Sequence, residues 1–281
     1  MSWLFFTIVA AIFWGVGQVF IKKGFSKIST LWTIVISTIV NALIYIPFAL
    51  ANNADLKIDL ILLPLIFFIS FLYIFFFYAI EKGQLAFAGT IFATYPLTTI
   101  ILSYIFLHER PSTFQYIMIV LILLGSILLS YFGTSKDNKK IKYTWILWAV
   151  LGAVTTGAGD FLAKIVLNNV QVNTYNFYYP LVYIISLGIF WTIDKKGRKL
   201  EKINIGQFKF TIIGITLLTM GLLSLNFAMS KGIVSIVTTV SSSYAALTIL
   251  LSYLFLKESI NKKQLFAIIL IIIGIVFIGL G

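Results

Sequence analysis

Long apolar runs separated by short polar breaks dominate this sequence of 281 residues and restrict what it can fold into. A helix needs about 20 apolar residues to cross a bilayer core of about 30 Å. In lipid the backbone amides of each run must bond within that run, so each run should be helical. We therefore expect ten transmembrane helices, at Trp3–Ile21, Thr30–Ala51, Leu60–Ile80, Leu85–Leu107, Phe114–Phe132, Thr144–Leu167, Val172–Ile193, Phe208–Met229, Ile233–Leu256 and Leu265–Leu280.

The composition excludes most other classes of protein. Only 11% of the residues are charged, against roughly 25% in soluble domains, which is too few to cover a water-facing surface. The chain has no Cys, so a disulfide, a thiolate nucleophile and a Cys-ligated metal are all excluded. His108 is the only histidine, which argues against a histidine metal site or catalytic triad. We expect an all-α integral membrane bundle that needs no metal or cofactor.

The basic residues carry information about orientation. A net charge of +12 suggests a nucleic-acid partner, but such binding needs Lys and Arg gathered on one folded polar surface. Here 17 of the 21 basic residues lie in or beside the loops that follow odd-numbered helices. The positive-inside rule places those loops in the cytoplasm and both termini outside the cell membrane. We expect the loop lysines to contact anionic lipid headgroups, and we expect no nucleic-acid partner.

The second half of the sequence repeats the first. At an offset of 142 residues, Gly15, Gly17, Gln18 and Lys22 fall on Gly157, Gly159, Asp160 and Lys164. At an offset of 149 residues, eleven polar, glycine and apolar positions are identical without a gap; Ala79, Lys82, Gly83, Tyr95, Ser103, Tyr104, Phe106, Leu107, Glu109, Gln115 and Gly125 fall on Ala228, Lys231, Gly232, Tyr244, Ser252, Tyr253, Phe255, Leu256, Glu258, Gln264 and Gly274. We expect two five-helix repeats, residues 1–133 and 144–281, joined by a basic loop at 134–143.

An odd number of helices in each copy has a topological consequence. The second copy enters the membrane from the opposite side, which gives an inverted-topology repeat. That arrangement recurs in secondary transporters, whose substrate site lies near the membrane midplane between the repeats. The alternative is a duplicated scaffold without a transport role.

Several short motifs resemble those of one transporter family. They are Trp14-Gly15 followed by Lys22, then Tyr95-Pro96-Leu97, Phe106-Leu107-His108-Glu109, Gln115 and Gly125, and the repeated Tyr244, Phe255-Leu256-Lys257-Glu258, Gln264 and Gly274. Over essentially its whole length the chain resembles the EamA-type transporters of the drug/metabolite transporter superfamily. The resemblance implies a ten-helix carrier of small metabolites, often amino acids, that works without ATP. The segment Thr30–Ala51 lacks the Arg that this family often has in its second helix.

Asp160 is the only one of nine acidic residues that lies well inside a predicted helix. A charged side chain at mid-bilayer costs about 2.5–3.5 kcal/mol on insertion scales, so it should face a cavity or a partner. One interpretation is an intrahelical pair with Lys164, which is four residues further on and shares its helical face. The other is that Asp160 faces a central cavity and meets a substrate cation or a coupling proton. Lys22, the repeat equivalent of Lys164, joins these charged candidates.

Other polar and aromatic side chains fall at similar depths in the predicted helices. For each of them the alternative interpretation is ordinary packing or, for a hydroxyl, a hydrogen bond back to its own helix. Pro96 removes a backbone hydrogen bond, so we expect it to bend the fourth helix. The candidates for substrate binding are Trp14, Gln18, Asn41, Tyr78, Thr94, Tyr95, Asp160, Tyr179, Asn226, Ser242 and Tyr244.

Together these features predict a secondary transporter that works by alternating access. Its expected cargo is a small neutral, zwitterionic or cationic metabolite such as an amino acid or an amine. Transport would be coupled to protons or to an ion gradient, in a monomer or a homodimer. One alternative is a lipid-headgroup flippase or a subunit of one. A less favoured alternative is an intramembrane enzyme, for which only Asp160 and Lys164 are available as an acid and a base.

Overall fold

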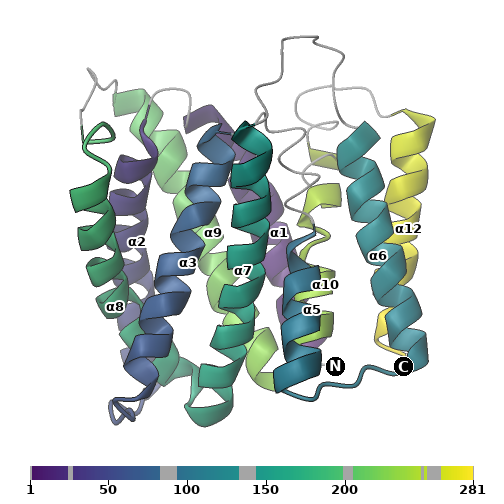
Figure 1. The fold of residues 1–281 in the computed structure, drawn as a ribbon, viewed down its shortest axis with the longest axis horizontal. Coiled ribbons are helices and arrows are strands. Elements are labelled where there is room, and N and C mark those ends of the chain that lie inside the picture. Colours follow the sequence, from purple (N-terminus) through teal and green to yellow (C-terminus); the bar gives the residue numbers. More distant parts are fainter. Residues whose placement is uncertain are drawn as a thin grey trace.

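A computed structural model describes residues 2–24, 28–82, 94–132, 144–198, 205–247, 250–251 and 261–280, and this part of the chain is an all-helical bundle (Figure 1). The prediction of an all-α fold is confirmed for these residues. The helices are α1 (Ser2–Gly24), α2 (Thr30–Ala51), α3 (Leu62–Lys82), α5 (Tyr95–Phe106), α6 (Thr113–Phe132), α7 (Thr144–Asn169), α8 (Val172–Ile193), α9 (Ile205–Lys231), α10 (Val234–Ser241) and α12 (Lys262–Ile278).

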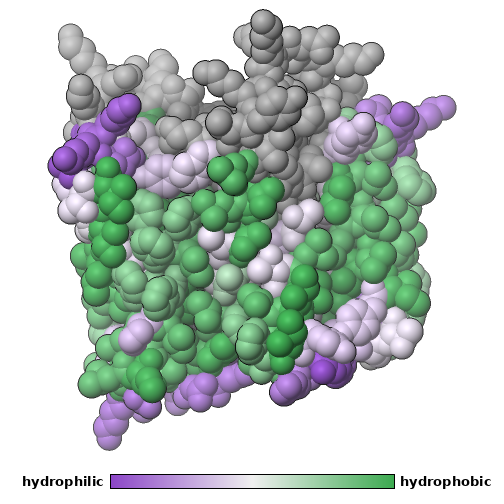
Figure 2. Space-filling view, viewed as in Figure 1, coloured by the Kyte–Doolittle hydropathy of each residue, from purple (hydrophilic) through white to green (hydrophobic). Residues whose placement is uncertain are grey.

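The bundle has the surface of a membrane protein. Apolar side chains cover a broad band between two polar ends (Figure 2). Among the described helices, five contain stretches long and apolar enough to cross a bilayer, in α1, α2, α7, α8 and α9. Shorter apolar stretches lie in α3, α5, α6 and α10. Both chain termini lie at one end of the bundle, which we call the terminal end (Figure 1). The α2–α3, α5–α6, α7–α8 and α9–α10 connections lie there too.

The two halves of the chain interleave rather than sit side by side. Helix α1, the first of its half, packs along α9, the third helix of the other half. Helix α7 packs along α3 in the corresponding way. The remaining extensive contacts also cross between the halves, with α2 against α8 and α6 against α12. In each half, the first helix therefore packs against the third helix of the other half, as expected when two copies of one unit pack against each other.

The α6–α12 contact depends on two glycines that the sequence repeat pairs. A Cβ at Gly125 would lie 2.7 Å from Ile271 Cγ1 and 2.8 Å from the Ala267 carbonyl oxygen. A Cβ at Gly274 would meet Ile122 in the same way. Small residues let membrane helices approach closely and pack their backbones together. Many other apolar side chains of α6 and α12 are exposed, Ile117 and Ile269 among them, so these two helices lie at the periphery of the bundle.

A methyl group added at Gly125 should therefore loosen the α6–α12 pair. Overpacking a tight contact costs about 1–3 kcal/mol. We expect Gly125→Ala to lower the thermal-unfolding temperature of the purified protein by several degrees. Gly188→Ala is the control, because a Cβ at Gly188 meets open space. Equal unfolding temperatures for the two variants would contradict this account of the contact.

Two predicted helices, Leu85–Leu107 and Ile233–Leu256, differ from expectation in their described part; their residues 85–93, 248–249 and 252–256 lie outside the described residues. Helix α5 begins at Tyr95, with Pro96 in its first turn, where a missing N–H breaks no helical hydrogen bond. Pro96 therefore helps to start this helix and does not bend it. Helix α10 ends at Ser241, and a turn at Ser242 and Ser243 precedes further helix at 244–247. The hydroxyls of Ser241 and Ser242 bond back to the carbonyls of Thr238 and Thr239. Such side chain to backbone bonds compete with continued helix.

Candidate functional site

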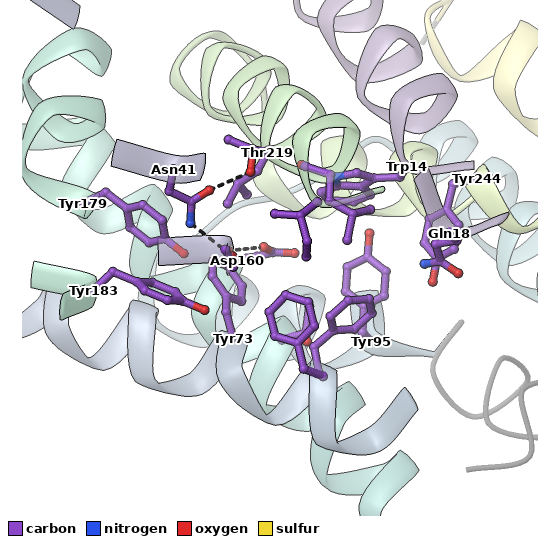
Figure 3. Close-up of a pocket in the computed structure, with 17 residues that line it drawn as sticks. Trp14, Gln18, Asn41, Tyr73, Tyr95, Asp160, Tyr179, Tyr183, Thr219 and Tyr244 are labelled. Atoms are coloured by element: carbon purple, nitrogen blue, oxygen red, sulfur yellow. Dashed lines mark hydrogen bonds between the residues drawn. The ribbon is translucent and has the colours of Figure 1, made fainter. Parts of the chain in front are cut away.

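A cavity of about 110 Å³ lies where the two halves meet, with its described walls drawn from both (Figure 3). Tyr95, the first residue of α5, and Tyr244, which follows the turn after α10, both line this space. The lining residues are Trp14, Gln18, Ser37, Asn41, Tyr73, Phe76, Phe77, Tyr95, Thr156, Asp160, Tyr179, Tyr183, Ile215, Leu218, Thr219, Leu222 and Tyr244.

Asp160 supplies the carboxylate of the cavity. The side chain is only 1% exposed, and its Oδ1 atom accepts a hydrogen bond of 2.6 Å from the Tyr73 hydroxyl. Its Oδ2 atom is buried and has no hydrogen-bond partner among the described residues. Gly159 makes room for this arrangement, because a Cβ there would lie 2.7 Å from the Tyr73 ring. One carboxylate oxygen is thus held by Tyr73, and the other has no hydrogen-bond partner among the described residues.

The predicted interaction partner of Asp160 lies elsewhere. The Lys164 ammonium donates to the carbonyl oxygens of Met229 and Gly232, at 2.7 and 2.9 Å. The interpretation of Asp160 and Lys164 as an intrahelical pair is therefore wrong in this conformation. The side chain of Lys22, the third charged candidate, lies outside the described residues. A buried carboxylate needs compensation, and Tyr73 supplies only one hydrogen bond to it.

Aromatic side chains line the cavity toward α5 and α10. The Trp14 and Tyr244 rings meet edge to face, with centroids 5.9 Å apart. The Trp14 indole N–H donates to the Leu218 carbonyl oxygen at 3.2 Å, which fixes the ring. The Tyr95 hydroxyl bonds with the Ser241 hydroxyl at 2.8 Å and donates to the Thr238 carbonyl oxygen at 3.1 Å. Gln18 lies beside Tyr244 in the close-up (Figure 3).

Polar and aromatic groups line the opposite side of the cavity. The Asn41 Oδ1 atom accepts a hydrogen bond of 2.7 Å from the Thr219 hydroxyl, while its Nδ2 atom donates to the Ser37 hydroxyl at 3.4 Å. The rings of Tyr179 and Tyr183 lie 5.7 Å apart, centroid to centroid. The cavity therefore combines one carboxylate, several neutral hydrogen-bonding groups and many ring faces. Its described lining contains no Lys, Arg or His.

The structure brings seven of the eleven candidate residues to this cavity. These are Trp14, Gln18, Asn41, Tyr95, Asp160, Tyr179 and Tyr244.

Four candidates lie outside the cavity lining. Tyr78 donates to the Asp194 carboxylate at 2.9 Å and stacks on Trp148 and Phe190. Asn226 donates to Asn176 Oδ1 at 2.8 Å. Ser242 bonds to its own helix, and Thr94 forms the N-cap position of α5. These four side chains do not line the cavity in this conformation, and their role in substrate binding stays a prediction.

Sequence reasoning missed five polar residues of the lining, Ser37, Tyr73, Thr156, Tyr183 and Thr219. Tyr73 is the most consequential, because it holds Asp160. Its stretch of α3 is aromatic nearly all round, so no apolar stripe marks the inward face. Thr156 had a usable signal, since it precedes Asp160 by four residues and therefore shares its helical face.

An all-helical bundle of apolar helices with an apolar belt and an internal cavity is typical of a multi-pass membrane protein. The model of the EamA-like transporter family matches the chain twice, over residues 1–131 and 143–280. The chain belongs to this family of membrane transporters.

Two further comparisons found similar proteins. Over 138 residues the chain is 35% identical to an uncharacterised protein of Methanocaldococcus jannaschii, MJ1333.1, and the match covers 49% of this chain and 98% of that protein. One crystal structure of a protein superposes with a TM-score of 0.80 at 16% identity, covering 99% of this chain and 96% of the other. At that identity the structural likeness concerns the fold alone.

Proposed function

We propose that this protein is a secondary transporter that moves a small, amine-bearing metabolite across the cell membrane by alternating access. The observation that carries the proposal is the free Oδ2 atom of Asp160 in a cavity lined by aromatic rings. A protonated amine would satisfy that oxygen with a charge-assisted hydrogen bond. Neutral and zwitterionic metabolites with an amine or a hydroxyl group are further candidate substrates, because these groups can also donate a hydrogen bond to that oxygen.

The aromatic walls add to the recognition of a cation. A cation over a ring face gains about 0.5–2 kcal/mol, with the larger value when water is excluded. Trp14, Tyr95 and Tyr179 present such rings, and the amide of Asn41 and the hydroxyl of Thr219 offer hydrogen bonds to the rest of the ligand. A small apolar or aromatic amine fits this combination of groups.

The same carboxylate couples transport of the substrate to movement of a proton. A buried charge is costly without compensation, so Asp160 favours states in which it holds either a cation or a proton. A site that alternates between these two occupants exchanges a proton for an amine across the membrane. The sodium ion is a second possible occupant, and ion-replacement experiments distinguish it from the proton.

Flux measurements in proteoliposomes test the proposal. The purified protein is presented with panels of amines, amino acids and labelled lipids. Accumulation of an amine or amino acid driven by a proton or sodium gradient supports the transporter. Lipid movement between leaflets without solute flux favours the flippase alternative. Turnover of a substrate without its movement favours the intramembrane enzyme.

The distribution of basic residues predicts the orientation of this transporter in the cell membrane. We expect both termini to lie outside the cell, because 17 of 21 basic residues lie near the opposite set of loops. A reporter enzyme that is active only in the cytoplasm should be inactive when fused to the C-terminus. Full reporter activity would reverse the proposed orientation.

A further inference from the structure

Two half-length helices separate the cavity from the terminal end of the bundle. Helix α5 starts at the cavity with Tyr95 and ends at Phe106, and α10 starts at Val234 and ends at Ser241. Both lie in the half of the bundle that carries the chain termini (Figure 1). They contact each other directly and belong to different halves of the chain. This contact therefore lies between the cavity and the terminal end of the bundle.

Hydrogen bonds join α5 to α10 at three levels. Nearest the cavity, the Tyr95 hydroxyl bonds with the Ser241 hydroxyl at 2.8 Å. Near the terminal end of α10, the hydroxyls of Ser103 and Ser235 lie 2.7 Å apart. Beyond the end of α5, Glu109 reaches the first residues of α10. We call these three contacts the α5–α10 zipper.

Glu109 makes the strongest contact of the zipper. Its two carboxylate oxygens accept from the backbone N–H groups of Val234 and Ser235, at 2.9 and 3.1 Å. The Ser235 hydroxyl donates to the same carboxylate at 2.7 Å. The first N–H groups of a helix have no partner within the helix, and an acidic group there also interacts favourably with the helix dipole. His108 has a positive φ of 52°, which turns the chain so that Glu109 meets the helix start.

Lys164 caps the C-terminal end of α9 next to the contact of Glu109 with α10. Its ammonium donates to the carbonyl oxygens of Met229 and Gly232, where α9 ends. These are carbonyls that a helix C-terminus leaves without an internal partner. Glu109 and Lys164 line one polar cavity of about 370 Å³, which is separate from the central cavity. Lys164 also lies one helical turn from Asp160, so α7 carries one charged group at each cavity.

We propose that Glu109 and Lys164 are positioning residues that hold the terminal end of the transporter closed in this conformation. Opening to that side requires the zipper to separate and the two helix ends to lose their caps. Tyr95 connects the two events, because it lines the central cavity and forms the first level of the zipper. A ligand that takes the Tyr95 hydroxyl weakens the closure. This inference rests on the proposed transport function.

The absence of Cys from the sequence allows a direct test by cross-linking. In Ser103→Cys/Ser235→Cys the two sulfurs replace hydroxyls that are 2.7 Å apart, which is within reach of a disulfide. We expect oxidation in proteoliposomes to stop flux and a reductant to restore it. Ser70→Cys/Ser186→Cys is the matched control, because those hydroxyls lie 2.6 Å apart between α3 and α8, outside the zipper. Full flux through the cross-linked Ser103–Ser235 variant would overturn the proposal.

A second experiment needs no transport substrate, so it separates failure of this inference from failure of the proposed function. Ser241→Cys places a single thiol at the cavity end of the zipper, where the native side chain is fully buried. A membrane-impermeant maleimide is added on the side that labels Asp55→Cys, an exposed position of the α2–α3 connection. We expect Glu109→Gln to raise the labelling rate of Ser241→Cys by about tenfold, since bonds to a charged acceptor are strong.

The control for labelling is Ser70→Cys, which is equally buried but lies between α3 and α8. Its labelling rate should not respond to Glu109→Gln. A rise at both cysteines would mean general unfolding, and no rise at Ser241→Cys would mean that Glu109 does not hold this end closed. Either result overturns the proposal.

Discussion

Asp160→Asn is expected to abolish coupled transport while leaving the protein folded. The substitution keeps the size of the side chain and an oxygen for the Tyr73 hydroxyl, but it removes the charge that compensates a bound cation. Loss of one partner from a buried charge pair costs about 2–5 kcal/mol. At low substrate concentration, flux should therefore fall by at least about thirtyfold. The measurement is initial uptake into proteoliposomes over a range of external pH.

The pH profile and a matched variant separate a transport role from a structural one. Asp55→Asn removes an acid that is exposed in the α2–α3 connection, and it should leave flux unchanged. The thermal-unfolding temperature of Asp160→Asn should stay near that of the parent protein, because Asp160 forms only one hydrogen bond among the described residues. Uptake by Asp160→Asn with the parental rate and pH profile would reject a coupling role for this carboxylate.

The long helices of the bundle could be predicted from the sequence because membrane thickness fixes the length of an apolar run. The expected bounds of α2 and α8 agree with the structure to the residue. The prediction was wrong where a described helix begins or ends inside a run that is apolar throughout. Leu85–Leu107 and Ile233–Leu256 each read as one helix, yet α5 begins at Tyr95 and α10 ends at Ser241. Hydropathy does not show where a helix begins or ends within an apolar run, because serine, threonine and proline occur both inside membrane helices and at their ends.

The residues of the site that could be predicted from the sequence are those whose type is unusual inside a membrane helix. Asp160 could be identified because an acid inside the membrane is expensive and needs a reason. Tyr73 and Tyr78 could not be distinguished, because both belong to a helix that is aromatic on nearly every face. The depth of a residue follows from counting along the helix, but its direction depends on the neighbouring helices. Asn226 shows the same limit, since it is buried as expected but meets Asn176 instead of the cavity.

Gly157→Ala is expected to have the second large effect, on stability and on transport together. Gly157 lies where α7 crosses the start of α5, and its carbonyl oxygen accepts a hydrogen bond of 2.9 Å from the Thr99 hydroxyl. A Cβ there would overlap the Tyr95 carbonyl oxygen and lie 2.7 Å from Thr98 Cβ. The overlap is with backbone, so no side-chain rotation relieves it. Overpacking of this kind costs about 1–3 kcal/mol, and it pushes Tyr95 away from both the cavity and Ser241.

Gly188→Ala isolates this steric effect from the intrinsic preference of alanine for helices. Both glycines lie inside long helices, α7 and α8. In a helix interior alanine is favoured over glycine by about 1 kcal/mol. A Cβ at Gly188 meets nothing within 4 Å, so that variant should keep or raise the thermal-unfolding temperature and retain full flux. Gly157→Ala should lower both quantities. If the two variants behave alike, the close approach of α5 to α7 is not what holds Tyr95 at the junction of the cavity and the zipper.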